Sequence, residues 1–102
     1  MDSLYSINDH ELLQRLTNYF KDDGFIACNN LQQAHELLSS LLVFYLINDM
    51  QFLLRVLYQI DVSETKVRAV FNCGNPKDIA PGLSQLIISR ELEKSISRRK
   101  YK

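Results

Sequence analysis

Cysteine, histidine and glycine are scarce in this chain, and each scarcity excludes a class of functional site. Cys28 and Cys73 are the two cysteines among 102 residues, and they lie far apart without a CxxC pair. His10 and His35 lack the spacing of metal ligands, and three isolated glycines cannot form a phosphate-binding loop. We therefore expect reduced thiols, no metal, no bound cofactor and a cytoplasmic location.

An excess of charge of either sign is also missing. Twelve Lys and Arg residues balance twelve Asp and Glu residues, which argues against a general nucleic-acid coat. The balance hides an asymmetry, because residues 1–50 carry seven acidic and two basic residues whereas residues 51–102 carry five acidic and ten basic residues. Such a distribution indicates either a basic tail that contacts an acidic partner or two halves that pack against each other.

No apolar run has the length of a membrane span, which needs about 20 residues. The most apolar stretch, residues 37–47, is interrupted by Asn48-Asp49 before apolar character resumes over residues 50–60. Its position in the chain and its acidic flanks also exclude a secretory signal. The pattern predicts a buried helix that is apolar on nearly all sides and is surrounded by other helices or shared with a second subunit.

Capping residues divide the rest of the chain into further helices. Asn8 precedes a first helix, and Asp22-Asp23-Gly24 ends it, with Gly24 free to adopt the left-handed conformation. Residues 25–28 are expected to form a packed connector. The predicted later helices are residues 31–47 after the Asn30 cap, 49–59, a short helix from the Ser63 cap to Gly74, and a last helix that ends near Arg98.

Two boundaries remain open at this level. We favour a helix break at Asn48-Asp49, with Gln51, Arg55 and Gln59 on a polar edge of the third helix, but a single helix over residues 31–60 is the alternative. The last helix begins either at Pro76, tolerating Pro81 inside it, or near Pro81.

Together these patterns predict an all-α fold, a small bundle of four or five helices with a near fully apolar central helix. The whole chain, residues 1–102, is expected to be a single domain. Residues 1–7 are expected to form an N-terminal arm, and residues 97–102 a basic C-terminal tail.

The tail carries the strongest local charge in the chain. Four cations, Arg98, Arg99, Lys100 and Lys102, surround Tyr101, and such a group can contact phosphates or an acidic partner while the aromatic ring stacks. Cations at the end of a helix also compensate its partial negative charge, and charged tails are commonly only solvated. A small adaptor for nucleic acid or an acidic partner is therefore the second functional hypothesis, and nucleic acid is not favoured.

Catalytic constellations are not apparent. His10 beside Glu11 and His35 beside Glu36 are adjacent helical residues that point in different directions, and neither pair has a third orienting group. Cys73 has no histidine near it in the sequence. We expect a protein that is not an enzyme.

The apolar surplus of the second and third helices supports the leading functional hypothesis, a non-enzymatic interaction module that associates with itself. These helices offer more apolar sides than three short neighbours can cover, which predicts an exposed patch for self-association or for another protein. The expected interface residues are Leu42, Phe44, Tyr45 and Phe52. A third hypothesis is a small apolar ligand in an aromatic-lined cavity.

The chain resembles small bacterial all-helical proteins of unassigned function in three segments. These are residues 52–62, residues 86–94 and the closing Arg98-Arg99-Lys100-Tyr101. This resemblance covers the C-terminal half of the chain. It implies a bacterial cytoplasmic protein and no particular activity.

Overall fold

The computed structural model describes the backbone of residues 2–100 and the side chains of residues 10–96. Five α-helices and one short 3-10 helix account for most of this part, and it contains no strand, which confirms the predicted all-α bundle. The elements are α1 (Asp2–Phe20), η1 (Asp23–Ala27), α2 (Leu31–Asn48), α3 (Met50–Ile60), α4 (Glu64–Phe71) and α5 (Pro76–Lys100).

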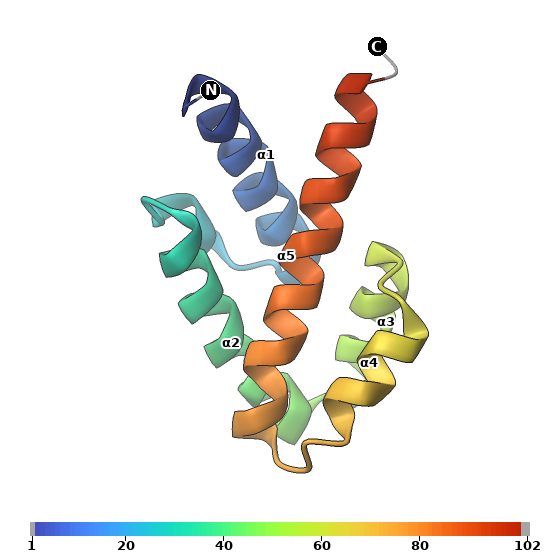
Figure 1. Cartoon of the computed structure of the whole chain (residues 1–102). Helices are drawn as coiled ribbons and strands as arrows, with labels where there is room; N and C mark the ends of the chain where they lie inside the picture. Colours follow the sequence, from blue (N-terminus) through green and yellow to red (C-terminus); the bar gives the residue numbers. More distant parts are fainter. Residues whose placement is uncertain (1, 101–102) are drawn as a thin grey trace.

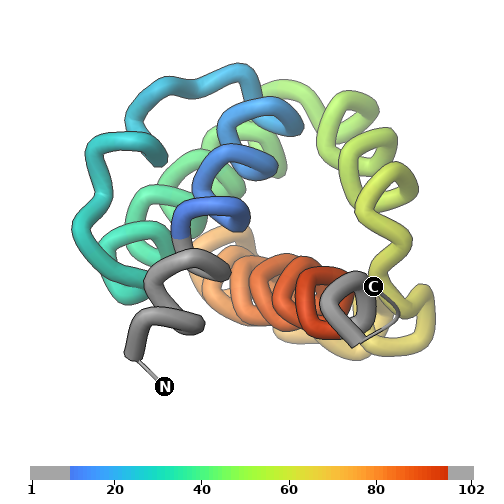
Figure 2. The backbone as a smooth tube through the Cα atoms, turned by 90° about the horizontal axis from the view of Figure 1, so that it is seen from above, coloured from blue at the N-terminus to red at the C-terminus, as the bar shows by residue number. Residues whose placement is uncertain are grey.

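The long helix α5 contacts each of the other four α-helices, and its contact with α2 is the most extensive in the molecule. In Figure 1 it runs along the molecule with α1 and α2 on one side and α3 and α4 on the other. Figure 2, seen from above, shows α5 foreshortened at the lower edge, with the rest of the described chain forming an arc on one side of it. The last helix therefore joins the bundle together, whereas the sequence pattern had placed α2 and α3 at its organising centre.

The core lies where α1, α2, α3 and α5 meet. Its buried side chains are almost all aliphatic or aromatic, as expected for helices that each bury one face. The fully buried large apolar members are Leu12, Leu16, Phe25, Leu38, Leu42, Leu53, Ile60, Leu83 and Ile87. The apolar helix α2 supplies Ala34, Leu38 and Leu42 to this core and leaves its other faces partly covered.

Side-chain caps begin α2, α4 and α5, and those at Asn30 and Ser63 confirm the prediction. Asn30 Oδ1 accepts a hydrogen bond from Gln33 N at 2.9 Å, and Ser63 Oγ accepts one from Lys66 N at 3.4 Å. Asn75 Oδ1 accepts from Asp78 N at 3.0 Å and so starts α5. Each cap satisfies a backbone donor that has no partner inside the helix.

The predicted break between α2 and α3 is confirmed, and Asp49 alone makes it. Its backbone at φ −153° and ψ 71° is outside the helical region. Its amide donates to Tyr45 O at 2.9 Å and ends α2, while its side chain accepts from Phe52 N at 3.1 Å and begins α3. Gln51, Arg55 and Gln59 are exposed, as the polar edge predicted.

The start and the end of α1 differ from the prediction. α1 begins at Asp2, so Asn8 lies within the helix and most of the expected arm is helical. The left-handed residue after α1 is Lys21, with φ 54°, whereas Gly24 lies inside η1. Gly24 is needed there for space, because a Cβ would lie 3.0 Å from Leu37 Cδ2.

The last helix is continuous. It begins at Pro76, includes Pro81, and extends to Lys100, so the first part of the expected tail has helical backbone. Pro81 is exposed and lies near the start of the helix, so the backbone hydrogen bond that it cannot donate is lost at the surface of the molecule.

Candidate interaction surface

A buried ionic cluster joins α1 to α5. The Glu91 side chain has no exposed surface, and the Lys94 Nζ atom lies 2.9 Å from its Oε2. Arg15 Nε lies 3.4 Å from Glu91 Oε1, and the Tyr19 hydroxyl donates to Glu91 Oε2 at 3.1 Å. Arg15 also donates to Ser95 Oγ at 2.8 Å. The carboxylate of Glu91 is thus paired with two cations of the same chain, Arg15 and Lys94. The cluster forms a polar contact between α1 and α5.

A glutamate is normally expected at a solvent-facing position of a helix, but Glu91 is fully buried in α5. Its burial follows the four-residue spacing of Leu83, Ile87 and Ser95, all of which are buried on the same side of α5. That spacing was the available signal. The opposing Arg15 is far away in the sequence, and so it could not be matched to Glu91 by pattern.

A histidine and a serine meet between α2 and α5. His35 Nδ1 lies 2.8 Å from Ser84 Oγ, but Ser84 is completely buried. The neighbouring carboxylate, Glu36, accepts instead from Gln32 Nε2 at 3.4 Å. An open hollow of about 480 Å³ beside His35 is lined by Leu31, Gln32, His35, Gln85, Ile88 and Ser89. Since Ser84 does not line this hollow, the pair presents no accessible nucleophile.

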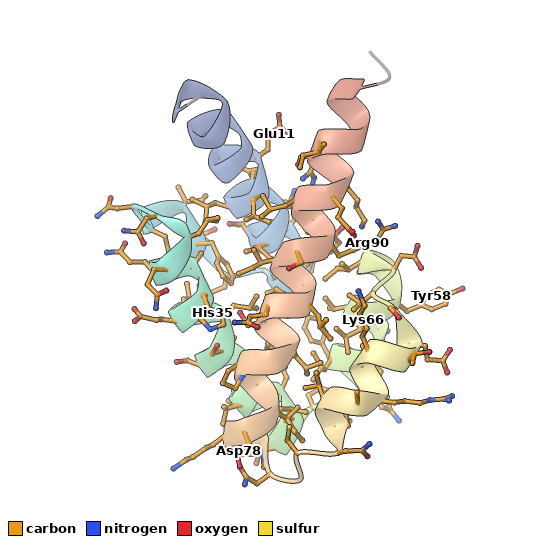
Figure 3. The ribbon with its side chains drawn as sticks, viewed as in Figure 1. Glu11, His35, Tyr58, Lys66, Asp78 and Arg90 are labelled. Carbon is orange, nitrogen blue, oxygen red and sulfur yellow. The ribbon has the colours of Figure 1, made fainter. Side chains whose placement is uncertain are left out.

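A second hollow, of about 380 Å³, lies between α5 and the connection from α3 to α4. Its lining is polar for the most part: Asp61, Val62, Ser63, Lys66, Leu86, Ser89, Arg90 and Glu93. The guanidinium of Arg90 is already engaged, donating to Asp61 O at 3.0 Å and to Asp61 Oδ2 at 3.2 Å. Figure 3 shows Arg90 and Lys66 on this side of the molecule.

Aromatic side chains line neither of these hollows. Phe20 instead packs against Phe25, Tyr45 and Phe52, with ring centroids 6.2 to 6.5 Å apart. Tyr45 and Phe52 are closest, at 4.6 Å. These rings fill the space between α1, α2 and α3, so the described hollows do not correspond to the expected aromatic-lined cavity.

The four expected interface residues occupy different environments. Leu42 is fully buried in the core, so it has no surface to offer a partner. Tyr45 and Phe52 are half-buried and pack on each other. Phe44 is 55% exposed and contacts Tyr45 edge to face at 5.3 Å. Of the four, Phe44 is the one that presents most of its side chain to solvent.

Further exposed apolar residues extend from Phe44 along α3. Ile47 is 65% exposed at the end of α2, and Met50, Leu54 and Tyr58 are 37%, 50% and 87% exposed on α3. Tyr58 projects away from the body of the molecule in Figure 3. We name these five residues, Phe44, Ile47, Met50, Leu54 and Tyr58, the α2–α3 apolar face. The spacing of four between the α3 members was the signal that sequence reasoning missed.

The apolar face carries most of the exposed hydrophobic surface in the described part of the chain. Five of the seven large hydrophobic residues found exposed there belong to it. With about 200 Å² for a large side chain, the exposed fractions leave on the order of 600 Å² of apolar surface. For comparison, the largest apolar patch on a typical single soluble chain is about 300 to 600 Å².

Charged side chains of both signs border the α3 part of this face, with Arg55 along its edge, Asp49 before Met50 and Asp61 after Tyr58. Arg55 is exposed and forms no ion pair or hydrogen bond with any residue whose side chain is described. Its helical neighbours on that edge, Gln51 and Gln59, are neutral. The rim of the face is therefore polar but weakly charged.

The basic cluster at the C-terminus lies outside the described side chains. The backbone of α5 reaches Lys100, but no contact of Arg98, Arg99, Lys100 or Lys102 is described. The acidic-partner and nucleic-acid hypotheses therefore stay predictions.

None of the helices in residues 2–100 combines the length and apolar character that a membrane span requires. Comparison of the chain with protein-family models, with curated proteins and with solved structures found no match in any of the three.

Proposed function

We propose that this protein is a non-enzymatic interaction module that associates with a second copy of itself through the α2–α3 apolar face. The observation that carries the proposal is the concentration of exposed apolar side chains, among them Ile47, Leu54 and Tyr58, on one pair of helices. Covering them releases ordered water and stabilises an assembly.

The size of the face supports a dimer. A standard protein interface buries about 800 Å² on each partner. The apolar face supplies on the order of 600 Å², and polar rim residues such as Gln51 and Arg55 add the remainder. An apolar centre with a polar rim is the usual composition of such an interface.

A second copy is favoured over a charged partner because the face has little charge. The exposed charged residues beside the α3 members, Arg55, Asp49 and Asp61, are of both signs, and Asp61 is already paired with Arg90, so no excess of one charge would attract an acidic or basic partner. The cytoplasmic location and the bacterial origin remain predictions from the sequence.

Sedimentation velocity over a concentration series tests the proposal. We expect a reversible monomer–dimer equilibrium, and Leu54→Gln should weaken the dimer about tenfold or more, since truncating a central apolar contact typically costs more than 1 kcal/mol. Ile26→Gln is the matched control, because Ile26 is 55% exposed but lies on η1, away from the face. A chain that stays monomeric at all concentrations would overturn the proposal.

A further inference from the structure

We infer that the two copies pair α3 against α3 in antiparallel orientation, with the two-fold axis passing beside Leu54. This inference rests on the proposed self-association and specifies its geometry. Leu54 would then contact the partner's Leu54, and Met50 would contact the partner's Tyr58.

The spacing on α3 is symmetric about Leu54. Met50 lies four residues before it and Tyr58 four residues after it, and both are exposed. At 1.5 Å per residue, each lies about 6 Å along the helix from Leu54. A two-fold axis at Leu54 therefore superimposes the axial position of Met50 on that of the partner's Tyr58.

The side chains at the two ends of the α3 face favour the antiparallel orientation. Tyr58 is the most exposed member at 87% and Met50 the least exposed at 37%, so Tyr58 offers a partner the larger free surface. Antiparallel pairing sets the exposed ring of one copy against the thioether of the other at both ends, which gives a favourable sulfur–aromatic contact. Parallel pairing would set ring against ring and thioether against thioether, without that contact.

The charge on the rim gives the arrangement a salt dependence. Arg55 follows Leu54 by one residue and so lies about 100° around the helix. The two-fold axis brings the same edge of both helices together, and the two Arg55 side chains then repel each other across the rim. Salt screens this repulsion and strengthens apolar burial, so the dimer should tighten as salt is added.

Disulfide cross-linking tests the geometry. In a chain with Cys28→Ser and Cys73→Ser, Leu54→Cys should form a disulfide-linked dimer under mild oxidation, because facing helices bring such Cα atoms within the distance of about 7 Å that a disulfide spans. Met50→Cys alone and Tyr58→Cys alone should not cross-link, since like positions lie about 12 Å apart along the helices. A mixture of these two variants should cross-link, and Ile26→Cys is the exposed control that should not.

Sedimentation velocity of the same variants distinguishes a failure of the antiparallel geometry from a failure of the proposed self-association. If dimers form but Leu54→Cys does not cross-link, or Met50→Cys links to itself, the antiparallel arrangement is wrong and self-association stands. If no dimer forms, self-association is wrong as well. We also expect Arg55→Gln to tighten the dimer severalfold at low salt, and a weakened dimer would contradict the rim geometry.

Discussion

A single buried carboxylate connects the first and last helices. Glu91 is enclosed by Arg15, Tyr19 and Lys94, with its side chain entirely removed from solvent. A buried ion pair adds little net stability compared with apolar packing, but the loss of one member leaves an uncompensated charge. The cluster therefore specifies how α1 sits on α5.

We expect Glu91→Gln to lower the free energy of unfolding by about 3 kcal/mol, because Arg15 and Lys94 lose their buried anion. Glu93→Gln is the matched control on the same helix: its side chain is 68% exposed and its pair with Arg90 is long, at 3.6 Å. That control should cost less than about 1 kcal/mol. Urea unfolding followed by far-UV circular dichroism measures the free energy of unfolding of both variants. Equal losses of stability in the two variants would show that the buried ionic cluster is not the cause.

The two thiols should differ in reactivity. Burial raises the pKa of the Cys28 thiol, whose sulfur also lies 3.6 Å from Gly24 O, whereas Cys73 is exposed. The thiolate is the reactive form, so a raised pKa leaves Cys28 less reactive at neutral pH, and its rate should increase as pH rises beyond the usual thiol range. Alkylation followed by mass spectrometry should label Cys73 first at pH 7. Labelling of Cys28 at the same rate would contradict this expectation.

At the scale of the element, α4 and α5 approach each other closely at Gly82. A Cβ on Gly82 would lie 2.9 Å from Val70 Cγ1, and valine has few alternative rotamers with which to move away. Glycine inside a helix is normally unfavourable. Its presence in α5 is therefore explained by the space that Val70 occupies.

Gly82→Ala should destabilise the protein by about 1 kcal/mol, because the steric cost of 1 to 3 kcal/mol exceeds the gain of about 1 kcal/mol in helix propensity. In a Val70→Ala background the same substitution should be neutral or stabilising. Thermal melts of the single and double variants measure the difference. A stabilising effect of Gly82→Ala with Val70 in place would contradict the close contact.

The elements whose signals are local were predictable from the sequence. Caps at Asn30, Ser63 and Asn75 bond to amides three residues away, and the break near Asp49 has the same origin. All of these lie within one helical turn, although local signals of the same kind at Asn8 and Gly24 misplaced the ends of α1.

Features that depend on distant residues were not predictable in this way. The burial of Glu91 depends on Arg15, and the central position of α5 depends on packing against four other helices. The sequence hypothesis placed an exposed apolar patch on the second and third helices, where exposed apolar residues are found, but it included Leu42, which the core covers. Choosing the exposed members required knowing which sides of α2 and α3 the rest of the bundle occupies.

At the scale of the whole molecule, the contacts of α5 with every other helix make the bundle a cooperative unit. The Cα radius of gyration, 13.4 Å, matches the value of about 13 Å for a compact domain of this length. Losing α5 would leave α3 and α4 without much of their cover. No half of the bundle keeps a complete core alone.

We therefore expect one unfolding transition, with coincident curves from far-UV circular dichroism and from tyrosine emission, since the chain lacks tryptophan. If the apolar face forms a dimer, the midpoint temperature should also rise with protein concentration. Leu54→Gln should remove that concentration dependence and keep a single transition. A separate early transition would contradict the cooperative role of α5.

The corner at Asp49 also restricts how the chain length can vary. Asp49 both ends α2 and begins α3, so no further linker residue separates the two helices. An inserted residue would turn α3 by about 100° about its own axis. The buried positions of Val56 and Ile60 would then be taken by Arg55 and Gln59. The rotation of α3 relative to α2 is thus fixed by this single residue. Insertions or deletions are better accommodated in the turn around Gly74, where a Cβ added to the glycine would meet no atom within 4 Å.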